Sequence, residues 1–449
     1  MRVITTYGLS PEFQAGDGID QGETISPLIW RIFYDPLLEA VQQDQSNGCI
    51  MKLEWPIDIK TNAKEIYTER IAAAAYVDDT VWVAKSKSNM EKIISISDEF
   101  FDINDIKING DKSEVIVINS SIPKEETNIM MGQPKVKISS NIDKPSRYLR
   151  IWFKSKAEKT HVKEMIKEDI KTFIGCIRCK IISNSHVIYL VNKVLLPKLE
   201  YRIKTTVLTD GECMSLFRPL LKIVKKKMGL VLSTPNATLM HEGIVGLRNL
   251  WQIQLESHAA EFFKRINNNY EMDARTTIMR LKQAQLNLGL TENIFNMSPQ
   301  FLTKHRLSNN LSYEIVVNMS HYLIKPSVAP ILAEEWKIKG NSKSIQQLMF
   351  EKGIIDINLS GLQKYGLFFI NQIIGINGNQ LLTWSQIRSL KQIRSRGRKP
   401  KWFKVIEELM IIKDDLDRNI KLDYRIENYN EETIMCKLKR PTDDKRKHE

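Results

Sequence analysis

The chain has few cysteines and no long apolar run, and each shortage excludes a class of protein. Its five cysteines are odd in number and scattered over 449 residues, which excludes a disulfide framework and indicates a reducing compartment. No apolar run approaches the roughly 20 residues that a membrane span needs. The first residues, MRVITTYGLSPEF, have no apolar core of the signal-peptide kind. We therefore expect a soluble intracellular protein, in the nucleus or the cytoplasm, with no membrane partner.

Acidic residues are also in short supply relative to basic ones. Lysine and arginine number 66 against 53 aspartates and glutamates, a formal net charge of +13. A surplus of this size favours a polyanionic partner, most simply nucleic acid, although a basic but inert surface is the alternative. The apolar content of 42% is that of an ordinary globular protein. The length suffices for two or three domains, each with its own core.

Two adjacent acids stand between two apolar runs in the stretch IAAAAYVDDTVWVA, residues 71–84. The pattern predicts a β-hairpin with its turn at 77–80. A hairpin with an acidic tip is one interpretation, because turns favour Asp. Two features favour a site instead. No Gly or Asn supplies the positive φ that tight hairpin turns prefer, and the adjacent carboxylates of Asp78 and Asp79 repel each other unless a cation such as Mg²⁺ neutralises them.

Three further motifs accompany this stretch. GIDQGETISPL, residues 18–28, precedes it, whereas IKIN with KSE, residues 106–109 and 112–114, and YLRIWF, residues 148–153, follow it. In this order and spacing the four motifs resemble the later motifs of a reverse transcriptase palm, of the non-LTR (LINE-type) retrotransposon kind. The resemblance covers the first third of the chain closely and continues more loosely as a helical thumb.

The resemblance implies an α+β fold with three regions. Residues 1–155 correspond to a polymerase right-hand palm, a partial antiparallel sheet with helices, and residues 156–240 to an all-α thumb. Residues 241–449 are helical in pattern but carry no motif that we can assign. Their most basic stretch is 391–404.

The resemblance also assigns roles to single residues around the acidic pair. Asp78 is implied as the stronger ligand of the catalytic Mg²⁺ and Asp79 as its weaker partner, with Tyr76 under the primer terminus. Gln21 and Gly22 are implied to line the nucleotide pocket. The alternative for these two is a glycine-rich loop that leads into a core helix.

The later motifs carry the remaining implied contacts of this region. Lys112 falls where the family has a lysine near the nucleotide phosphates, and a solvated turn lysine is the alternative. Tyr148, Leu149 and Arg150 fall on the primer grip, which usually reads Tyr-Leu-Gly followed by apolar residues. Because Arg150 replaces the Gly, the backbone contact of the family is altered, and the arginine could instead reach a phosphate.

Local patterns predict the elements around these motifs. Ser26 and Pro27 read as the N-cap and first residue of a helix, and Pro36 would kink it or start a second segment. The predicted apolar face of this helix consists of Leu28, Ile29, Ile32 and Phe33. A second helix is expected over 89–101. Short strands are expected at 106–108 and 115–118, and a loop or small hairpin at 121–142.

Three amphipathic helices are predicted after residue 157. The first has an apolar stripe over 162–174, the second spans 186–198 and ends at Pro197, and the third opens with a capping box of Thr209 and Glu212. The third helix carries the basic cluster Lys222, Lys225, Lys226 and Lys227. In the family such a thumb grips the primer–template duplex, whereas a plain bundle with a solvated lysine face is the alternative.

Two smaller motifs lie outside the palm. Arg396 and Arg398, in the sequence RSRGRKP, partly match arms that insert arginine into a narrow minor groove. A solvated loop is the alternative, and it could still supply phosphate contacts. Cys176 and Cys179 form a lone C-x-x-C without a second pair, which we interpret as two helix cysteines and not as a zinc site.

DNA synthesis uses two metal ions about 4 Å apart, and the family takes a further Asp for them from an earlier palm strand. This chain starts after that position, so we expect an N-terminally truncated polymerase that is poorly active alone. Three interpretations stay open. In the first, the chain is part of a retroelement RNA-directed DNA polymerase that uses an RNA template, a DNA primer and deoxynucleoside triphosphates. In the second, it is a catalytically inactive nucleic-acid-binding remnant. In the third, it is a helical interaction protein with an accidental acidic hairpin.

Overall fold

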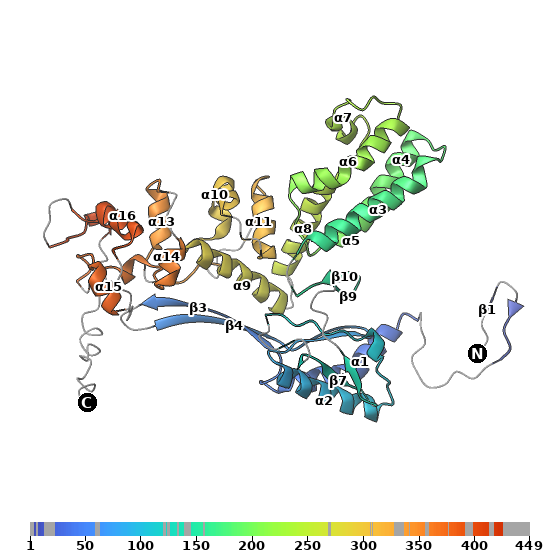
Figure 1. Ribbon diagram of the computed structural model, residues 1–449, viewed down its shortest axis with the longest axis horizontal. Coiled ribbons are helices and arrows are strands. Elements are labelled where there is room, and N and C mark those ends of the chain that lie inside the picture. Colours follow the sequence, from blue (N-terminus) through green and yellow to red (C-terminus); the bar gives the residue numbers. More distant parts are fainter. Residues whose placement is uncertain are drawn as a thin grey trace. The chain divides into compact units, whose positions relative to one another are not determined.

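The computed structural model divides the chain into two compact units (Figure 1). Unit 1 comprises Met1–Met51 and Arg70–Glu158, and unit 2 comprises Lys52–Glu69 and Lys159–Glu449. Residues 4–424 are described, except for gaps at 6–7, 13–22, 59–62, 120–122, 124–125, 133, 139–144, 156–157, 268–270, 306, 308, 327–335, 341, 355–358, 376, 391–397 and 413–416. Within these ranges no helix is both long and apolar enough to cross a membrane.

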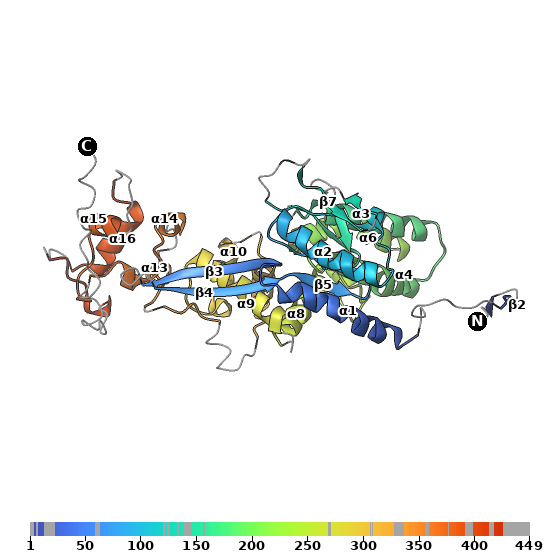
Figure 2. The ribbon, with the colours of Figure 1, turned by 90° about the horizontal axis from the view of Figure 1, so that it is seen from below.

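Unit 1 mixes helices with two-stranded sheets. In chain order its elements are β1 (Ile4–Thr5), β2 (Gly8–Leu9), α1 (Ser26–Gln43), β5 (Ala73–Tyr76), β6 (Asp79–Trp82), α2 (Lys87–Ile103), the 3₁₀ turn η1 (Gly110–Lys112), β7 (Ile129–Met131), β8 (Val136–Ile138), β9 (Ser146–Tyr148) and β10 (Ile151–Phe153). Helices α1 and α2 lie side by side (Figure 2), and the small core between them includes Leu37 and Val41 from α1 and Ile93 from α2.

Helix α1 forms where the sequence predicts a helix, but it buries a different face. Leu28, Ile29 and Ile32, from the predicted apolar face, are between 42% and 65% exposed. The buried face carries Tyr34 and Leu37 instead. The sequence of α1 has two apolar stripes. The helix buries the stripe that contains Tyr34 and Leu37, because a large aromatic side chain such as that of Tyr34 buries much apolar area.

The ends of α1 also correct the local predictions. Its N-cap is Ile25 and not Ser26, and the helix runs without interruption past Pro36. At the other end, the guanidinium of Arg70 donates hydrogen bonds to the carbonyls of Asp44 and Asn47, at 3.0 and 3.2 Å. A cation at this position complements the carbonyls that a helix C-terminus leaves unpaired.

The segment after α2 contains turns where strands were predicted. Neither 106–108 nor 115–118 forms a strand. Between them lies η1, whose cap residue Asn109 accepts a hydrogen bond from the backbone N–H of Lys112 at 3.2 Å. The apolar side chains of these two segments line a cavity, described below, instead of a sheet. Strands β7 and β8 form a hairpin that pairs Ile129 with Ile138, which confirms the hairpin alternative for 121–142.

Unit 2 is largely helical. Its elements are the paired strands β3 (Cys49–Asp58) and β4 (Ala63–Ile71), whose first and last residues belong to unit 1, and then α3 (Thr160–Arg178), α4 (Asn184–Leu190), the π-helical turn η3 (Val191–Leu195), α5 (Leu196–Ile203), α6 (Asp210–Lys227), α7 (Asn236–Met240), α8 (Leu250–Ile266), α9 (Glu271–Leu288), η4 (Ile294–Asn296), α10 (Pro299–Lys304), α11 (Leu311–Ser320), α13 (Ile345–Glu351), α14 (Leu359–Lys364), η5 (Ile370–Gln372), α15 (Trp384–Leu390), α16 (Lys401–Met410) and η6 (Leu422–Tyr424).

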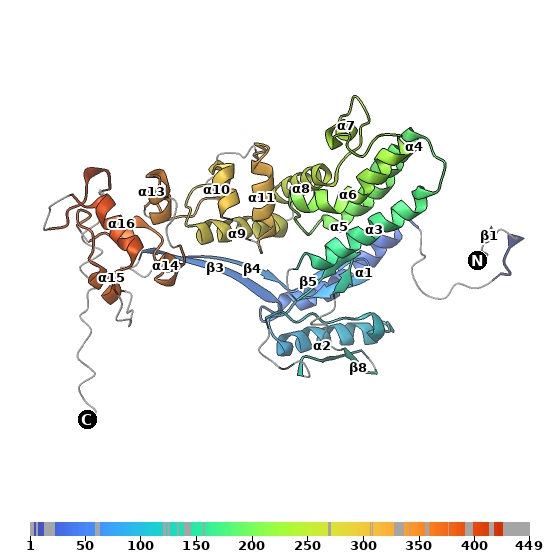
Figure 3. The ribbon, with the colours of Figure 1, turned by 45° about the horizontal axis from the view of Figure 1, so that its top comes forward.

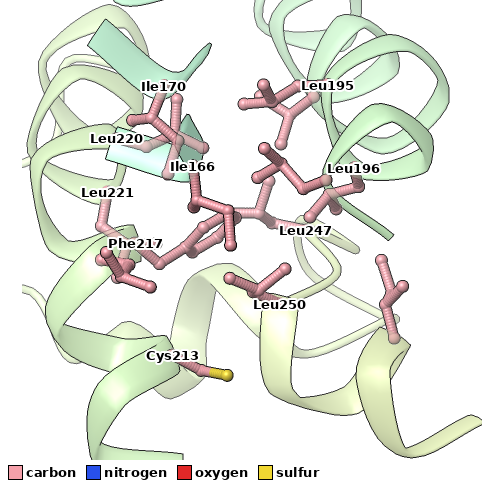
Figure 4. Close-up of a cluster of buried hydrophobic side chains, with 14 of the residues drawn as sticks. Ile166, Ile170, Leu195, Leu196, Cys213, Phe217, Leu220, Leu221, Leu247 and Leu250 are labelled. Carbon is pink, nitrogen blue, oxygen red and sulfur yellow. The ribbon is translucent and has the colours of Figure 1, made fainter. Parts of the chain in front are cut away.

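Helices α3 to α6, with the start of α8, share one apolar core (Figure 4). Ile166 and Ile170 from α3 face Phe217 and Leu220 from α6, and Leu250 of α8 closes the cluster. The capping box predicted at the start of α6 is present: the side chain of Thr209 accepts from the backbone N–H of Glu212, and the carboxylate of Glu212 accepts from that of Thr209. The three predicted amphipathic patterns thus form helices.

The second of these helices does not end at Pro197. The chain widens into the π turn η3, in which the N–H of Leu196 donates to the carbonyl of Val191, and it then continues as α5 to Ile203. Pro197 falls in the first turn of α5, where a helix tolerates a residue without an N–H. The extra residue also rotates the apolar face of the helix, and Val194 is 53% exposed.

The β3–β4 hairpin is part of the core of unit 2, although in sequence it lies between α1 and β5 of unit 1. Trp55 is 2% exposed and packs with Ile338 and Phe369, and its indole N–H donates to the carbonyl of Lys339 at 3.0 Å. Further along, the amide of Gln372 donates to the carbonyl of Pro56 at 3.3 Å. Figure 3 shows the hairpin running beneath α9 towards α13 and α14.

Candidate active site

The two acids lie at the tip of a tight antiparallel hairpin. Strands β5 and β6 pair Tyr76 with Asp79, so the turn itself consists of Val77 and Asp78. The predicted hairpin is confirmed, with a turn that takes only the first two residues of the predicted 77–80. Val77 has φ +55°, and a β-branched residue in this left-handed region is strained. Strain of this kind persists only where the surroundings hold the backbone in place.

Three aromatic side chains hold this turn. The indole N–H of Trp30 donates to the carbonyl of Val77 at 2.7 Å. The hydroxyls of Tyr34 and Thr80 share a hydrogen bond of 3.0 Å, and the hydroxyl of Tyr148 donates to the carbonyl of Asp79 at 3.3 Å. Burial and the nearby Asp79 carboxylate raise the pKa of Tyr148, so its hydroxyl stays protonated as a donor.

A cavity of about 600 Å³ within unit 1 brings the later motifs together. Asp78 and Asp79 line it from the segment Val77–Asp79, here called the acidic turn, Lys112 from η1 and Tyr148 from β9. These residues are separated by up to 70 positions along the chain, and the folding of β9 and η1 around the hairpin gathers them. Lys107 and Arg147 also line the cavity, so its wall carries cations beside the two carboxylates.

Other predicted residues lie elsewhere. Tyr76 is 64% exposed and does not line the cavity. The residues matched to the primer grip belong to a hairpin, in which β9 pairs with β10 and Leu149 and Arg150 form the turn. Gln21 and Gly22 lie outside the described residues.

The basic residues predicted in unit 2 separate into three groups. Lys222 and Lys226 are exposed on α6, whereas Lys225 is only 7% exposed and its ammonium donates to the carbonyl of Leu232 at 3.1 Å. Lys225 is therefore not available for a phosphate. Arg398 is exposed, and Arg396 lies outside the described residues.

Arg150 lies in a backbone conformation that favours glycine, the residue usual at this position of the primer grip. Its φ is +63°, and that of Leu149 is +47°. We expect Arg150→Gly to increase the protection of residues 146–153 against hydrogen exchange. Glycine relieves the strain of the left-handed conformation, about 1–2 kcal/mol. This gain exceeds the cost of the greater conformational entropy of the unfolded chain, about 0.4–1 kcal/mol. The control Arg147→Gly, within β9 itself, should lower protection. Lower protection in both variants would contradict the strained turn.

Sequence reasoning missed Trp30 and Tyr34. They stand four positions apart on α1 and stack with ring centroids 5.6 Å apart, so they share one face of the helix. The signal in the sequence that could have indicated them is the i, i+4 spacing of two aromatic residues that each carry a polar atom. Such residues bury their rings while the N–H or O–H seeks a partner, and here both partners belong to the acidic turn.

The donor set at the turn suits a hard divalent cation. Among the described residues, no group of three or more His, Cys, Asp or Glu side chains is placed to hold a metal ion. Asp78 and Asp79 nonetheless offer adjacent, exposed carboxylates at the edge of a cavity. Mg²⁺ in polymerase sites is commonly bound by one or two carboxylates together with substrate phosphates. The residues present fit that mode of binding.

Comparison with known proteins shows which family the first third of the chain resembles. A family model described as reverse transcriptase (RNA-dependent DNA polymerase) matches residues 8–163. The chain contains a reverse transcriptase domain. The matched range includes the acidic turn and every residue named above as lining the cavity.

One protein with distant similarity to the chain comes from a retrotransposable element. The retrovirus-related Pol polyprotein from the type-2 retrotransposable element R2DM of Drosophila melanogaster is 23% identical to the chain over 233 residues. The alignment covers 51% of this chain and 20% of the relative, so the aligned half of the chain spans about a fifth of the length of that polyprotein.

Proposed function

We propose that the chain acts as an RNA-directed DNA polymerase whose catalytic centre is the acidic turn of unit 1. The convergence of Asp78, Asp79 and Lys112 on one cavity carries this proposal, because the two acids and the lysine come from different motifs and the residues that line the cavity fall within the matched range 8–163. On this assignment unit 1 contributes the palm, and helices α3 to α6 act as the thumb.

In this proposal the acidic residues of the cavity bind the metal ion and the basic residues bind the nucleotide. Asp78 and Asp79 would hold Mg²⁺, which would supply activation of the primer 3′-hydroxyl and stabilisation of the charge that develops during phosphoryl transfer. Lys112 and Arg147 provide positive charge for the triphosphate of the incoming deoxynucleotide. Trp30 and Tyr148 hold the backbone on either side of Asp78. The substrates are an RNA template, a DNA primer and deoxynucleoside triphosphates.

The direct experiment is extension of a labelled DNA primer on an RNA template, with Mg²⁺ and four deoxynucleoside triphosphates at low salt. We expect low levels of template-coded products, because only two of the carboxylates that the family uses are identified in this chain. We expect none when EDTA removes the metal. A run with a DNA template of the same sequence measures the template preference. A chain that binds the primer–template duplex tightly but never extends it would contradict polymerase activity and support the second function.

The second candidate function is nucleic-acid binding without polymerisation. The net charge of +13 and the exposed Lys222 and Lys226 of α6 favour it. Both functions require binding by these lysines, so their contribution is tested separately.

We expect the double variant Lys222→Gln, Lys226→Gln to bind RNA–DNA duplex more weakly, and the slope of log affinity against log salt to fall by about 2, or roughly 1 for each lost phosphate contact. The control Lys343→Gln removes an exposed lysine that is paired with Glu351 at 2.8 Å. It should leave the slope unchanged. An equal slope in the double variant and the wild type would remove α6 from the binding surface.

A further inference from the structure

Helix α1 contacts the acidic turn at the residues that bracket the two acids. Trp30 donates to the carbonyl of Val77, directly before Asp78. Tyr34 shares a hydrogen bond with Thr80, directly after Asp79. The two aromatic residues therefore hold both sides of the acidic pair, and they do so from one face of a single helix.

The contact with Val77 bears directly on the orientation of Asp78. The carbonyl of Val77 and the N–H of Asp78 belong to the same planar peptide group. A hydrogen bond that fixes this carbonyl therefore fixes the plane from which the Asp78 side chain departs. Because Val77 is held at φ +55°, a conformation that a β-branched residue disfavours, loss of the Trp30 donor allows the turn to relax.

The helix itself is well anchored for this task. Tyr34 is 4% exposed, and its ring packs edge-on against Phe100 and nearly parallel to Phe101, both of α2. Burial raises the pKa of the Tyr34 hydroxyl, so it stays neutral and available for Thr80. A side chain enclosed in this way transmits the position of α1 to the turn without freedom to swing away.

We propose that Trp30 and Tyr34 are positioning residues that set the orientation of Asp78 and Asp79 for metal binding. The proposal rests on the proposed function and deepens it. Groups that orient metal ligands typically contribute about 10- to 100-fold to metal affinity or activity. Neither residue is expected to touch the substrate.

The test compares Trp30→Phe, which keeps an aromatic ring and removes the donor, with Tyr34→Phe, which removes only the hydroxyl. Phe33→Leu is the control, because Phe33 lies on the same helix and contacts the rings of Trp30 and Phe100 but has no polar atom for the turn. We expect kcat for single-nucleotide incorporation to fall about 10- to 100-fold in the two test variants. KM for the deoxynucleotide should change by no more than about twofold, and the control should resemble the wild type.

A second measurement does not depend on activity. In the metal-free protein, the amides of residues 76–80 should exchange hydrogen faster in Trp30→Phe and Tyr34→Phe than in wild type and control. If the wild type incorporates no nucleotide, the proposed function fails, whereas this exchange measurement still tests the positioning. Unchanged exchange at 76–80 in both test variants would overturn the positioning role.

A variant at the partner of Tyr34 controls for the possibility that the test variants act by misfolding α1. Thr80→Val removes the partner of Tyr34 without altering the helix. We expect Thr80→Val and Tyr34→Phe to have similar effects on kcat, and the double variant to be no worse than either, because both break the same hydrogen bond. Fully additive effects would contradict the coupling.

Discussion

Asp78→Asn should reduce primer extension on an RNA template by at least about 10³-fold. Loss of one preorganised group that stabilises developing charge typically costs about 10²–10³ in kcat, and Asp78 is proposed to act through a metal ion that both positions and activates the reacting groups. The amide is nearly isosteric with the carboxylate but carries no charge. The fold of the turn should therefore survive, because its hydrogen bonds come from Trp30, Tyr34 and Tyr148.

The control for this variant is Asp105→Asn. Asp105 is exposed, lies in unit 1 and does not line the cavity, and its φ of +52° is one that Asn tolerates. Both variants should bind primer–template duplex as tightly as the wild type. Extension by Asp78→Asn at the rate of the control would contradict the role of the acidic turn.

Trp55→Ala should destabilise unit 2 by about 3–5 kcal/mol, the usual cost of removing a large aromatic side chain from a core. The indole is 2% exposed, packs with Ile338 and Phe369, and donates to the carbonyl of Lys339. The variant therefore leaves a cavity and a carbonyl without its donor. The readout is the thermal or denaturant midpoint of the full chain.

Ile66→Ala is the matched control for the hairpin. Ile66 lies on β4 and is 54% exposed, so its truncation should cost less than about 0.5 kcal/mol. A larger loss for Trp55→Ala than for Ile66→Ala shows that residues 52–69 are part of the core of the C-terminal region. Equal midpoints in the two variants would mean that the hairpin is not packed there.

Features fixed by neighbouring residues were predictable from the sequence. The hairpin around Asp78 follows from two apolar runs that flank a polar turn, and the start of α6 follows from the reciprocal bonding of Thr209 and Glu212. Both depend on fewer than about a dozen residues, so local chemistry decides them.

Features fixed by distant residues were not predictable. The burial of Lys225 depends on how the chain returns after α6 to present the carbonyl of Leu232. The buried face of α1 depends on α2, which supplies Ile93 and Phe100. The contact between Pro56 and Gln372 joins positions more than 300 residues apart, and no pattern within either segment indicates the other.

The most direct test of the catalytic centre is the binding of Mn²⁺, as a spectroscopic substitute for Mg²⁺, followed by electron paramagnetic resonance with primer, RNA template and deoxynucleotide present. We expect the wild type and Asp105→Asn to bind the ion with equal affinity. Asp78→Asn should bind it at least about 10-fold more weakly, because it loses a direct ligand, whose loss costs at least as much as that of an outer partner. Equal Mn²⁺ affinity in wild type and Asp78→Asn would contradict the assignment of the acidic turn as the metal site.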